Sequence, residues 1–446
     1  MNPHLLLAPV VLALCCTCLA QTAPGSAAAH NDLAEMSAVP MTSDEAVAAA
    51  LEANPQIHAA VRQLALAQSK TSTARSLDDP MFMVRDWNTP LRQPWDLNQA
   101  QLMFSIQQSF LSGQKRDLRA KIAGDDADEA ASDLESLRQE VASEVRKLCT
   151  DLKRNAQEMS LHDRQSSLLK EALSASLAQY TAGRVSQADV LRAQMAVTRL
   201  SEHLIELETE RDTAQAQLNA LMGRPPDQPV EIVGEYAAPA ETPPLEELER
   251  LAMEHRPELA GLRKALAKSR DRAQSTRLAM KPDFTAALGY MLMPTGSTSR
   301  NAYMAELSMN LPSLNRQRHE GEAKQADAAT AVAEADLETR TSAVFLEVRQ
   351  AQVQIAAAQK RSNLYRDTLL PQAEAAFKAA TAAYQNNRAE FPMLIDSQNL
   401  LLDIEMASYK ASADCDAAVA QLERAIGTTL PPKTGTDEHG TERTSK

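Results

Sequence analysis

Apolar residues recur at a helical spacing along most of the chain. Around Leu134, Val141 and Val145 they step by three or four positions, which keeps one face of a helix apolar. From Ala193 to Leu221 they follow a heptad ladder, in which the single omission is Arg211. The pattern predicts two long helices, 115–182 and 186–222, the first about 100 Å long at 1.5 Å per residue. Gly183 lies between them and tolerates a positive φ, so we expect a helical hairpin that turns there.

The same pattern returns in the second half of the chain. Tyr180, Gln194, Leu218 and Gly223 match Tyr384, Gln398, Leu422 and Gly427, each at an offset of 204 residues. The second hairpin is expected to turn near Asn386 and Asn387, because asparagine tolerates the left-handed conformation. We therefore predict two homologous repeats, 43–223 and 245–427, joined by a proline-rich connector, 224–244.

Each repeat begins with a helix and continues with two short segments that alternate polar and apolar residues. The first helix is expected to run unbroken from Ser43 to Ser76, with Ser43 or Asp44 as its N-cap. Pro80 and Pro282 end the helices that precede the alternating segments. These segments lie at about 81–110 and 284–311, with turns at 88–98 and 294–300, and they predict two strands in each repeat.

Composition and charge narrow the possible functions. The chain has 46 basic and 59 acidic residues and a net charge of −13, which argues against a nucleic-acid partner. The body lacks an 18-residue apolar run, so a bundle of membrane-spanning helices is not expected. We find no nucleophile elbow, phosphate-binding loop or zinc-protease motif, and the eight histidines form no spaced ligand set. The chain is therefore not predicted to be an enzyme, and no cofactor or metal site is expected.

The N-terminus reads as a targeting segment. An apolar run, 5–14, precedes small residues, and residues 1–20 are expected to be a signal peptide cleaved after Ala20. The alternative is a lipid anchor on Cys18. Residues 21–42 are expected to be a polar tail, and residues 428–446 a disordered C-terminal tail. Cys149 and Cys415 remain in the mature chain as small apolar residues of helix faces, with a single bridge between them as the alternative.

Four strands in one chain pose a physical problem. They are too few to close a barrel, and an isolated sheet would leave two unpaired edges. Several chains that each contribute strands to one closed barrel would remove every edge. The long hairpins likewise need neighbours along their length, which a hollow assembly of coiled coils supplies. An exported protein of this kind suggests a conduit between two compartments.

The chain resembles the TolC-type outer-membrane efflux proteins of Gram-negative bacteria over about Ser43 to Gly427. The motif that carries the resemblance is Tyr180-x-x-Gly183-x-x-Ser186-x-x-Asp189-Val190-Leu191-x-Ala193-Gln194, which ends at Leu221-x-Gly223 and recurs in the second repeat. Arg256-Pro257-Glu258-Leu259, after the connector, adds to it.

The resemblance implies a mainly α fold with a β-barrel portion. Three chains would share a twelve-stranded barrel in the outer-membrane lipid and a coiled-coil tube that reaches into the periplasm. Such a homotrimer would export substrate passively when engaged by a membrane-fusion adaptor and an inner-membrane pump of the RND type. Alternatives are a type I secretion duct and a periplasmic coiled-coil adaptor or structural protein without a pore.

The resemblance also assigns roles to residues at the hairpin tips. Two acidic positions usually narrow the entrance, and here they hold Met393 and Asp396, so that Glu390 would have to compensate for the methionine. Asp189, in the first repeat, is included in the same periplasmic constriction. The adaptor contact is assigned to the remaining tip residues: Tyr180, Gly183, Arg184, Tyr384, Asn387 and Arg388.

The transported substrate is less well defined. Segments 107–119 and 311–316 are more similar to the CzcC- and CusC-like heavy-metal-resistance branch than to the drug-exporting branch. Soft thioethers suit Cu(I), and methionines are dense near the predicted strands. The simpler interpretation of these methionines is flexible apolar filler of the barrel wall. They are Met81, Met83, Met103, Met280, Met291, Met293, Met304 and Met309.

Overall fold

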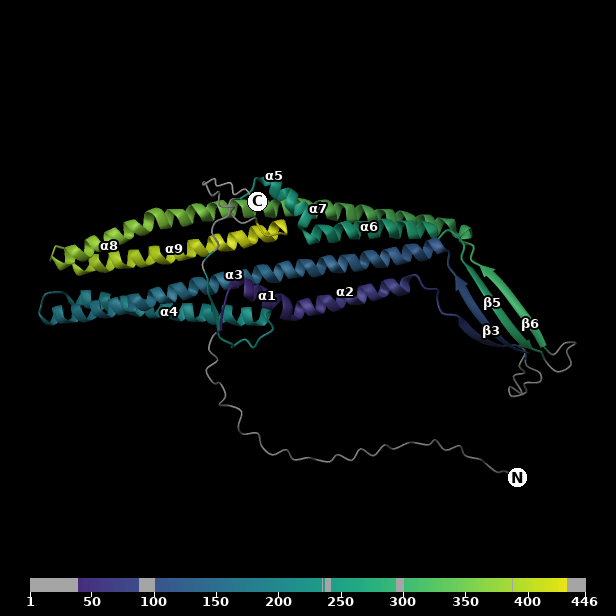
Figure 1. Cartoon of the computed structure of the whole chain (residues 1–446), viewed down its shortest axis with the longest axis horizontal. Helices are drawn as coiled ribbons and strands as arrows, with labels where there is room; N and C mark the ends of the chain where they lie inside the picture. The colour runs from purple at the N-terminus through teal and green to yellow at the C-terminus, as the bar shows by residue number, and fades with distance from the viewer. Residues whose placement is uncertain are drawn as a thin grey trace, which may run out of the picture.

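The computed structural model describes residues 39–87, 101–234, 236, 242–293, 301–386 and 388–430. The predicted signal peptide, Cys18, both strand-connecting turns, Asn387 and the chain beyond 430 lie outside the described residues. Figure 1 shows an elongated molecule with a sheet at one end and two helical hairpin tips at the other. Within the described residues, no helix is long and apolar enough to cross a bilayer.

Two long helical hairpins form the body of the molecule. Hairpin 1 consists of α3 (Gly113–Thr181) and α4 (Gln187–Leu221), and α3 alone has 69 residues. Hairpin 2 consists of α7 (Arg316–Leu364), the π-helical turn η2 (Tyr365–Leu369), α8 (Leu370–Gln385) and α9 (Phe391–Ile426). Figure 1 shows the two hairpins side by side along the long axis. The hairpin prediction is therefore confirmed.

The helix expected over Ser43–Ser76 is divided, so this prediction was wrong. Two helices occupy the segment, α1 (Ser43–Ala53) and α2 (Pro55–Ala74), because Asn54 has an extended ψ of 124° and Pro55 starts the second helix. The second repeat breaks in the same way into α5 (Leu245–His255) and α6 (Pro257–Leu278). The N-cap of α1 is Thr42, rather than Ser43 or Asp44, and it forms a capping box with Glu45.

Two short strands lie where the sequence suggested irregular chain. β1 (Val39–Met41) belongs to the segment taken as a polar tail, and β4 (Val230–Ile232) belongs to the connector. They pair in parallel, with Val39 opposite Val230. Leu430, at the start of the predicted C-terminal tail, is buried, and its N–H donates to the Glu423 carboxylate over 3.0 Å. The ordered body is thus slightly longer at both ends than predicted.

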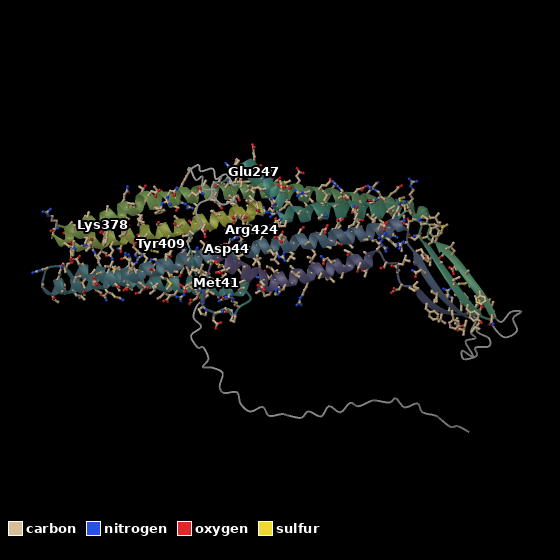
Figure 2. The ribbon with its side chains drawn as sticks, in the orientation of Figure 1. Met41, Asp44, Glu247, Lys378, Tyr409 and Arg424 are labelled. Atoms are coloured by element: carbon tan, nitrogen blue, oxygen red, sulfur yellow. The ribbon has the colours of Figure 1, made fainter. Side chains whose placement is uncertain are left out.

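Each repeat has its own core near the middle of the molecule. The first core joins α1, α3 and α4 around Val145 and Leu218, and the second joins α5, α7 and α9 around Val348 and Leu422. Leu218 and Leu422 are the matched residues at an offset of 204, and both are fully buried. Asp44, near the start of α1, and Arg424, near the end of α9, mark this central region in Figure 2.

The cysteines are buried and free, and they belong to different cores. Cys149 lies in the first core and Cys415 in the second. Burial raises the pKa of the Cys149 thiol to about 11. Both therefore serve as small apolar residues, and the alternative of a bridge between them is wrong for this structure.

Four antiparallel strands form the terminal sheet in the order β2-β3-β5-β6. They are β2 (Met81–Trp87), β3 (Gln101–Phe110), β5 (Phe284–Leu292) and β6 (Asn301–Met309). The two central strands, β3 and β5, come from different repeats, and Phe110 lies opposite Phe284. The sheet therefore joins the two repeats through backbone hydrogen bonds between β3 and β5.

Candidate functional site

The tip of hairpin 1 is built by a specific local sequence. Gly183 has a φ of +68°, and the Arg184 N–H returns to the Gln179 carbonyl over 2.9 Å, which ends α3. Ser186 then caps α4 in a capping box with Asp189, whose carboxylate accepts the Ser186 hydroxyl over 2.7 Å. The predicted constriction residue Asp189 thus has a local structural task in this chain, since its carboxylate holds the start of α4.

The tip of hairpin 2 is less tightly defined. Asn386 ends α8 with a φ of −91°, so the left-handed conformation expected there is not found at this residue. The Arg388 N–H closes the turn on the Ala383 carbonyl over 2.8 Å. Glu390 is the N-cap of α9 but makes no capping hydrogen bond with its side chain. Its carboxylate is exposed and remains available to an approaching cation or partner.

The family resemblance assigns the adaptor contact to residues at the tips, and most of the described ones are exposed. Tyr180, Gly183, Arg184 and Arg388 are all exposed. Tyr384 is only partly exposed, because its hydroxyl accepts a hydrogen bond from Gln179 Nε2 over 3.1 Å. This bond links hairpin 1 to hairpin 2 beside the tips.

A second polar link lies deeper between the hairpins. Gln398 on α9 donates to Gln165 on α3 over 2.6 Å, and both side chains are buried. Gln398 is one of the residues by which the sequence repeat was recognised, but its contact with α3 carried no sequence signal. Because buried amides are costly to leave unpaired, this pair helps to fix how the two hairpins lie together.

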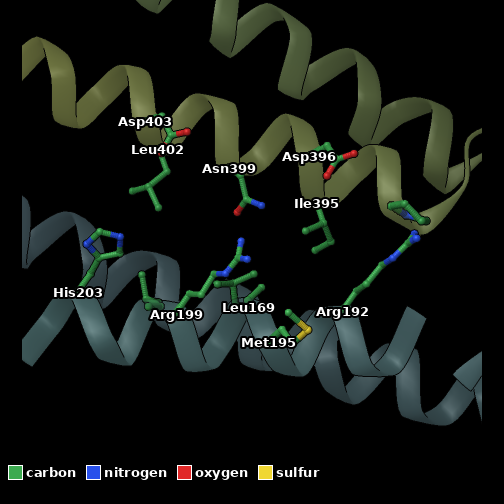
Figure 3. A pocket seen from close by; sticks show the side chains of 13 residues that line it. Leu169, Arg192, Met195, Arg199, His203, Ile395, Asp396, Asn399, Leu402 and Asp403 are labelled. Atoms are coloured by element: carbon green, nitrogen blue, oxygen red, sulfur yellow. The ribbon is translucent and has the colours of Figure 1, made fainter. Parts of the chain in front are cut away.

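Asp396 lies on the edge of a groove between the hairpins. The groove has a volume of about 480 Å³ and is lined by residues of α3, α4 and α9. Arg192 and Arg199 line it from α4, whereas Asp396 and Asp403 line it from α9. In Figure 3, Arg199 extends across the groove toward Asn399. The basic residues were not identified from the sequence, and they offset the acidic charge beside Asp396.

Met393, the other constriction position, is exposed on the first turn of α9. Asp396 is also exposed, one turn further along the same helix. The structure therefore brings Glu390, Met393 and Asp396 together at the start of α9, while Asp189 serves the neighbouring hairpin.

A buried histidine, His162, stacks on an exposed one, His203, deeper in hairpin 1. The ring of His162 on α3 stacks on the ring of His203 on α4 with centroids 5.8 Å apart. Burial, and secondarily the neighbouring His203, lower the pKa of His162. Neither ring nitrogen of His162 has a hydrogen-bond partner among the described residues. Those residues also contain no group of three acidic, histidine or cysteine side chains that fits a metal ion.

The terminal sheet has two chemically different faces. Phe82, Ile106 and Leu288 lie opposite one another on the first face, and Leu288 is 70% exposed. One rung further, Tyr303 continues this apolar face and is 88% exposed. The opposite face carries most of the polar side chains of the sheet, interspersed with methionines and small residues: Arg85, Gln101, Ser105, Gln107, Ser109, Thr285, Glu306 and Ser308. We call the two surfaces the apolar face and the polar face.

Comparison with known proteins identifies the family of this chain. The sequence profile described as outer membrane efflux protein matches residues 46–224 and 248–428. The cobalt-zinc-cadmium resistance protein CzcC of Cupriavidus metallidurans is 23% identical over 392 residues, covering 87% of this chain and 90% of that protein.

Solved structures show the same fold. The outer membrane protein VceC of Vibrio cholerae matches with a TM-score of 0.72 and 17% identity, over 87% of this chain and 96% of VceC. A structure of CusC matches with a TM-score of 0.75 and 12% identity, over 87% of this chain and 92% of CusC.

The profile covers both repeats, so the alternative of a periplasmic adaptor or a coiled-coil protein without a pore is wrong. The prediction of a mainly helical protein with two long hairpins and four strands, in the fold of outer-membrane efflux channels, is confirmed. The chain belongs to the outer membrane efflux protein family, whose members are channels rather than enzymes, and it is an outer-membrane channel protein with a periplasmic helical tube.

Proposed function

We propose that three copies of this chain form one duct, with a closed barrel of twelve strands in the outer membrane and a helical tube beneath it. The observation that carries this proposal is the terminal sheet. Its edge strands, β2 and β6, each pair on one side only within the described residues, and its apolar face is exposed. Unpaired edges in a membrane are costly, and closure with further copies satisfies both of them.

The dimensions of the sheet agree with a membrane barrel. β3 has 10 residues and β5 and β6 have 9 each, close to the length that a tilted strand needs to span a bilayer. The apolar face would meet lipid and the polar face would line the lumen, the usual division in outer-membrane barrels.

In this proposal the duct exports substrate passively as part of a tripartite system. A periplasmic adaptor engages the tips, and an inner-membrane pump of the RND type supplies the energy. The relative CzcC is named for resistance to cobalt, zinc and cadmium, and we propose heavy-metal cations as the cargo of this duct. Glu390 and Asp396 from three chains would gather acidic charge at the entrance, which attracts cations.

The assembly can be tested by cross-linking between copies. Val84→Cys on β2 is combined with single cysteines along β6 at Tyr303, Ala305 and Leu307, after Cys149 and Cys415 are replaced by alanine. We expect at least one pairing to give covalent dimers and trimers in outer membranes. Val84→Cys with Leu288→Cys on the central strand β5 is the matched control and should give none. Cross-linking in neither set, together with a monomeric native mass in detergent, would refute the shared barrel.

The substrate class is tested in cells that lack their own efflux duct. Restored tolerance to zinc, cobalt or cadmium supports the heavy-metal proposal. Restored secretion of a protein without any change in metal tolerance would favour a type I secretion duct instead.

The acidic entrance is tested by single-channel recording. Asp396→Asn should lower the preference for cations, because each of three chains loses one negative charge at the entrance. Arg192→Gln, on the opposite side of the groove, should change the preference in the other direction. Unchanged selectivity in both variants would place the selective region elsewhere.

A further inference from the structure

The strand register places methionines on the polar face of the sheet. Met103 lies directly opposite Met291 in the β3–β5 pairing. In the adjacent rung on the same face, Met83 pairs with Ser105 across β2 and β3, and Met304 pairs with Gly289 across β6 and β5. We call Met83, Met103, Met291 and Met304 the methionine patch. It spans all four strands in two neighbouring rungs.

The side chains of the patch are buried or partly buried. Met103 is only 1% exposed, although it lies on a strand of a single sheet. A Cβ added to Gly289 would lie 3.6 Å from the Met304 methyl carbon, so Met304 lies over the glycine. Directly opposed residues in a sheet have Cβ atoms about 5 Å apart, which is within reach of two flexible thioethers.

Two of the four sulfur atoms accept hydrogen bonds from polar side chains of the same face. Gln101 Nε2 donates to Met291 Sδ over 2.8 Å, and Arg85 Nη2 donates to Met83 Sδ over 3.2 Å. The sulfur atoms of Met83 and Met291 are therefore oriented toward polar side chains, with lone pairs that a cation could also use. On the apolar face, where filler is expected, the described strands carry only Met309.

We propose that the methionine patch binds soft monovalent cations, Cu(I) or Ag(I), through thioether sulfur. Thioethers are neutral soft ligands that select Cu(I) over cations preferring nitrogen or oxygen, such as Zn²⁺ and Mg²⁺. An arriving cation would displace the Gln101 and Arg85 donors from sulfur. Neutral ligands without a carboxylate hold the cation weakly, as a conducting path needs. That the patch lines a lumen rests on the proposed function, because the lumen forms only in the trimeric barrel. Cation binding by the patch needs only the four strands of one chain.

Binding is tested by titrating the full-length protein in detergent with silver nitrate in chloride-free buffer. The test variant changes all four patch residues to leucine, a swap that nearly conserves volume. The matched control changes four methionines away from the patch to leucine: Met195, Met253, Met280 and Met309. We expect the affinity for Ag(I) to fall on the order of 100-fold in the patch variant, because the variant loses its soft ligands. In the control the affinity should stay within about twofold of the unmodified protein. Equal affinities in both variants would overturn the proposal.

A second measurement uses the unmodified protein and does not depend on how a variant folds. Mild peroxide converts accessible methionine to its sulfoxide, and a metal bound to sulfur slows this reaction. We expect Ag(I) to protect Met83, Met291 and Met304, but not Met309, when the peptides are analysed by mass spectrometry. Equal oxidation of the patch with and without Ag(I) would overturn the proposal.

Metal tolerance separates this proposal from the proposed function. If the unmodified chain restores tolerance to zinc and silver, and the patch variant restores zinc tolerance alone, both proposals are supported. If the patch variant restores both equally, the soft-cation path is refuted while the duct stands. If the unmodified chain restores neither, heavy-metal export is refuted, and the titration and the oxidation experiment still decide the patch.

Discussion

The glycine that ends α9 allows a strict test of how the second repeat is held together. Gly427 has a φ of +75°, which disfavours any residue with a Cβ. A Cβ added here would also lie 2.8 Å from the His255 carbonyl oxygen, 2.9 Å from its carbonyl carbon and 3.0 Å from Arg256 Cα. All three are backbone atoms at the junction of α5 and α6. The junction can make room for the new atom only if the backbone itself moves.

Two costs add in the variant Gly427→Ala. The left-handed conformation costs about 1–2 kcal/mol for a residue with a Cβ. Overpacking against a backbone that must shift typically costs a further 1–3 kcal/mol. We expect Gly427→Ala to lower the free energy of unfolding by about 2–5 kcal/mol, the sum of these two costs.

Gly183 is the matched control, because only the first cost applies to it. Its φ is +68°, and a Cβ added there would meet no atom within 4 Å. Gly183→Ala should therefore cost only about 1–2 kcal/mol. Gly321 inside α7 also has open space but no positive φ, and Gly321→Ala should stabilise the helix by about 0.5–1 kcal/mol.

The assay is urea unfolding followed by the helical circular dichroism of the detergent-extracted protein, at one fixed protein concentration. The expected order of stability is Gly321→Ala, the unmodified chain, Gly183→Ala and then Gly427→Ala. Equal costs at positions 183 and 427 would refute the reasoning, because they would show that the close contact with the α5–α6 junction contributes nothing.

Three further predictions concern the described side chains. Lys115→Met should lower the free energy of unfolding by about 2–4 kcal/mol, because Lys115 is the buried partner of the Asp283 carboxylate, with Nζ 2.8 Å from Oδ2. Lys264→Met is the matched control: its ion pair with Asp128 is exposed, and its loss should cost less than about 1 kcal/mol. The lowered pKa of His162 means that the unfolded chain binds a proton more readily, so stability should fall as the pH drops below about 6.5, and His162→Gln should flatten that decline in unfolding experiments at graded pH. Cys149, whose thiol pKa is raised to about 11, should resist iodoacetamide at pH 8 until urea unfolds the chain, as mass spectrometry can show; rapid labelling of the native protein would contradict its burial.

The long elements of this fold were accessible from the sequence because their patterns extend over many turns. The heptad ladder through Leu200, Leu207 and Leu218 predicted α4, and those residues are buried. The repeat at an offset of 204 predicted the second hairpin from the first. Alternation over nine or ten residues predicted the strands within one or two positions.

Short or non-local features gave no comparable signal. β1 and β4 have three residues each and pair across almost the whole first repeat, so no periodicity marks either of them. Helix α1 ends at Ala53 because Pro55 starts the next helix, but the apolar pattern continues past the break and hides it. Pro371 starts α8 after the π-helical turn, where the Leu370 N–H reaches the Tyr365 carbonyl.

The candidate site also combines local features, which the sequence predicts, with non-local ones, which it does not. The capping box of Ser186 and Asp189 is a local pattern that the sequence does contain, and it explains why Asp189 holds a helix end. The arginines that face Asp396 are not local, because the angle between the hairpins decides which face of α4 meets α9. The methionine patch depends on the pairing of several strands. Alternation assigns each methionine to a face, but only the register of all three strand pairs, β2–β3, β3–β5 and β5–β6, puts Met83 and Met304 in one rung.

The two tips descend from one repeated motif, yet the structure holds them differently. At the first tip a glycine with positive φ ends α3, and a capping box starts α4, so both helix ends are fixed by side-chain or backbone hydrogen bonds. At the second tip Glu390 makes no side-chain cap, and the helix leading to it is interrupted by the π-helical turn, where bending costs less than in a regular helix. Hairpin 2 also carries Asp396 and the exposed Glu390. The acidic residues proposed for the entrance therefore lie on the hairpin with fewer local constraints. The Gln179–Tyr384 and Gln165–Gln398 hydrogen bonds help to fasten the part of this hairpin near its tip to hairpin 1.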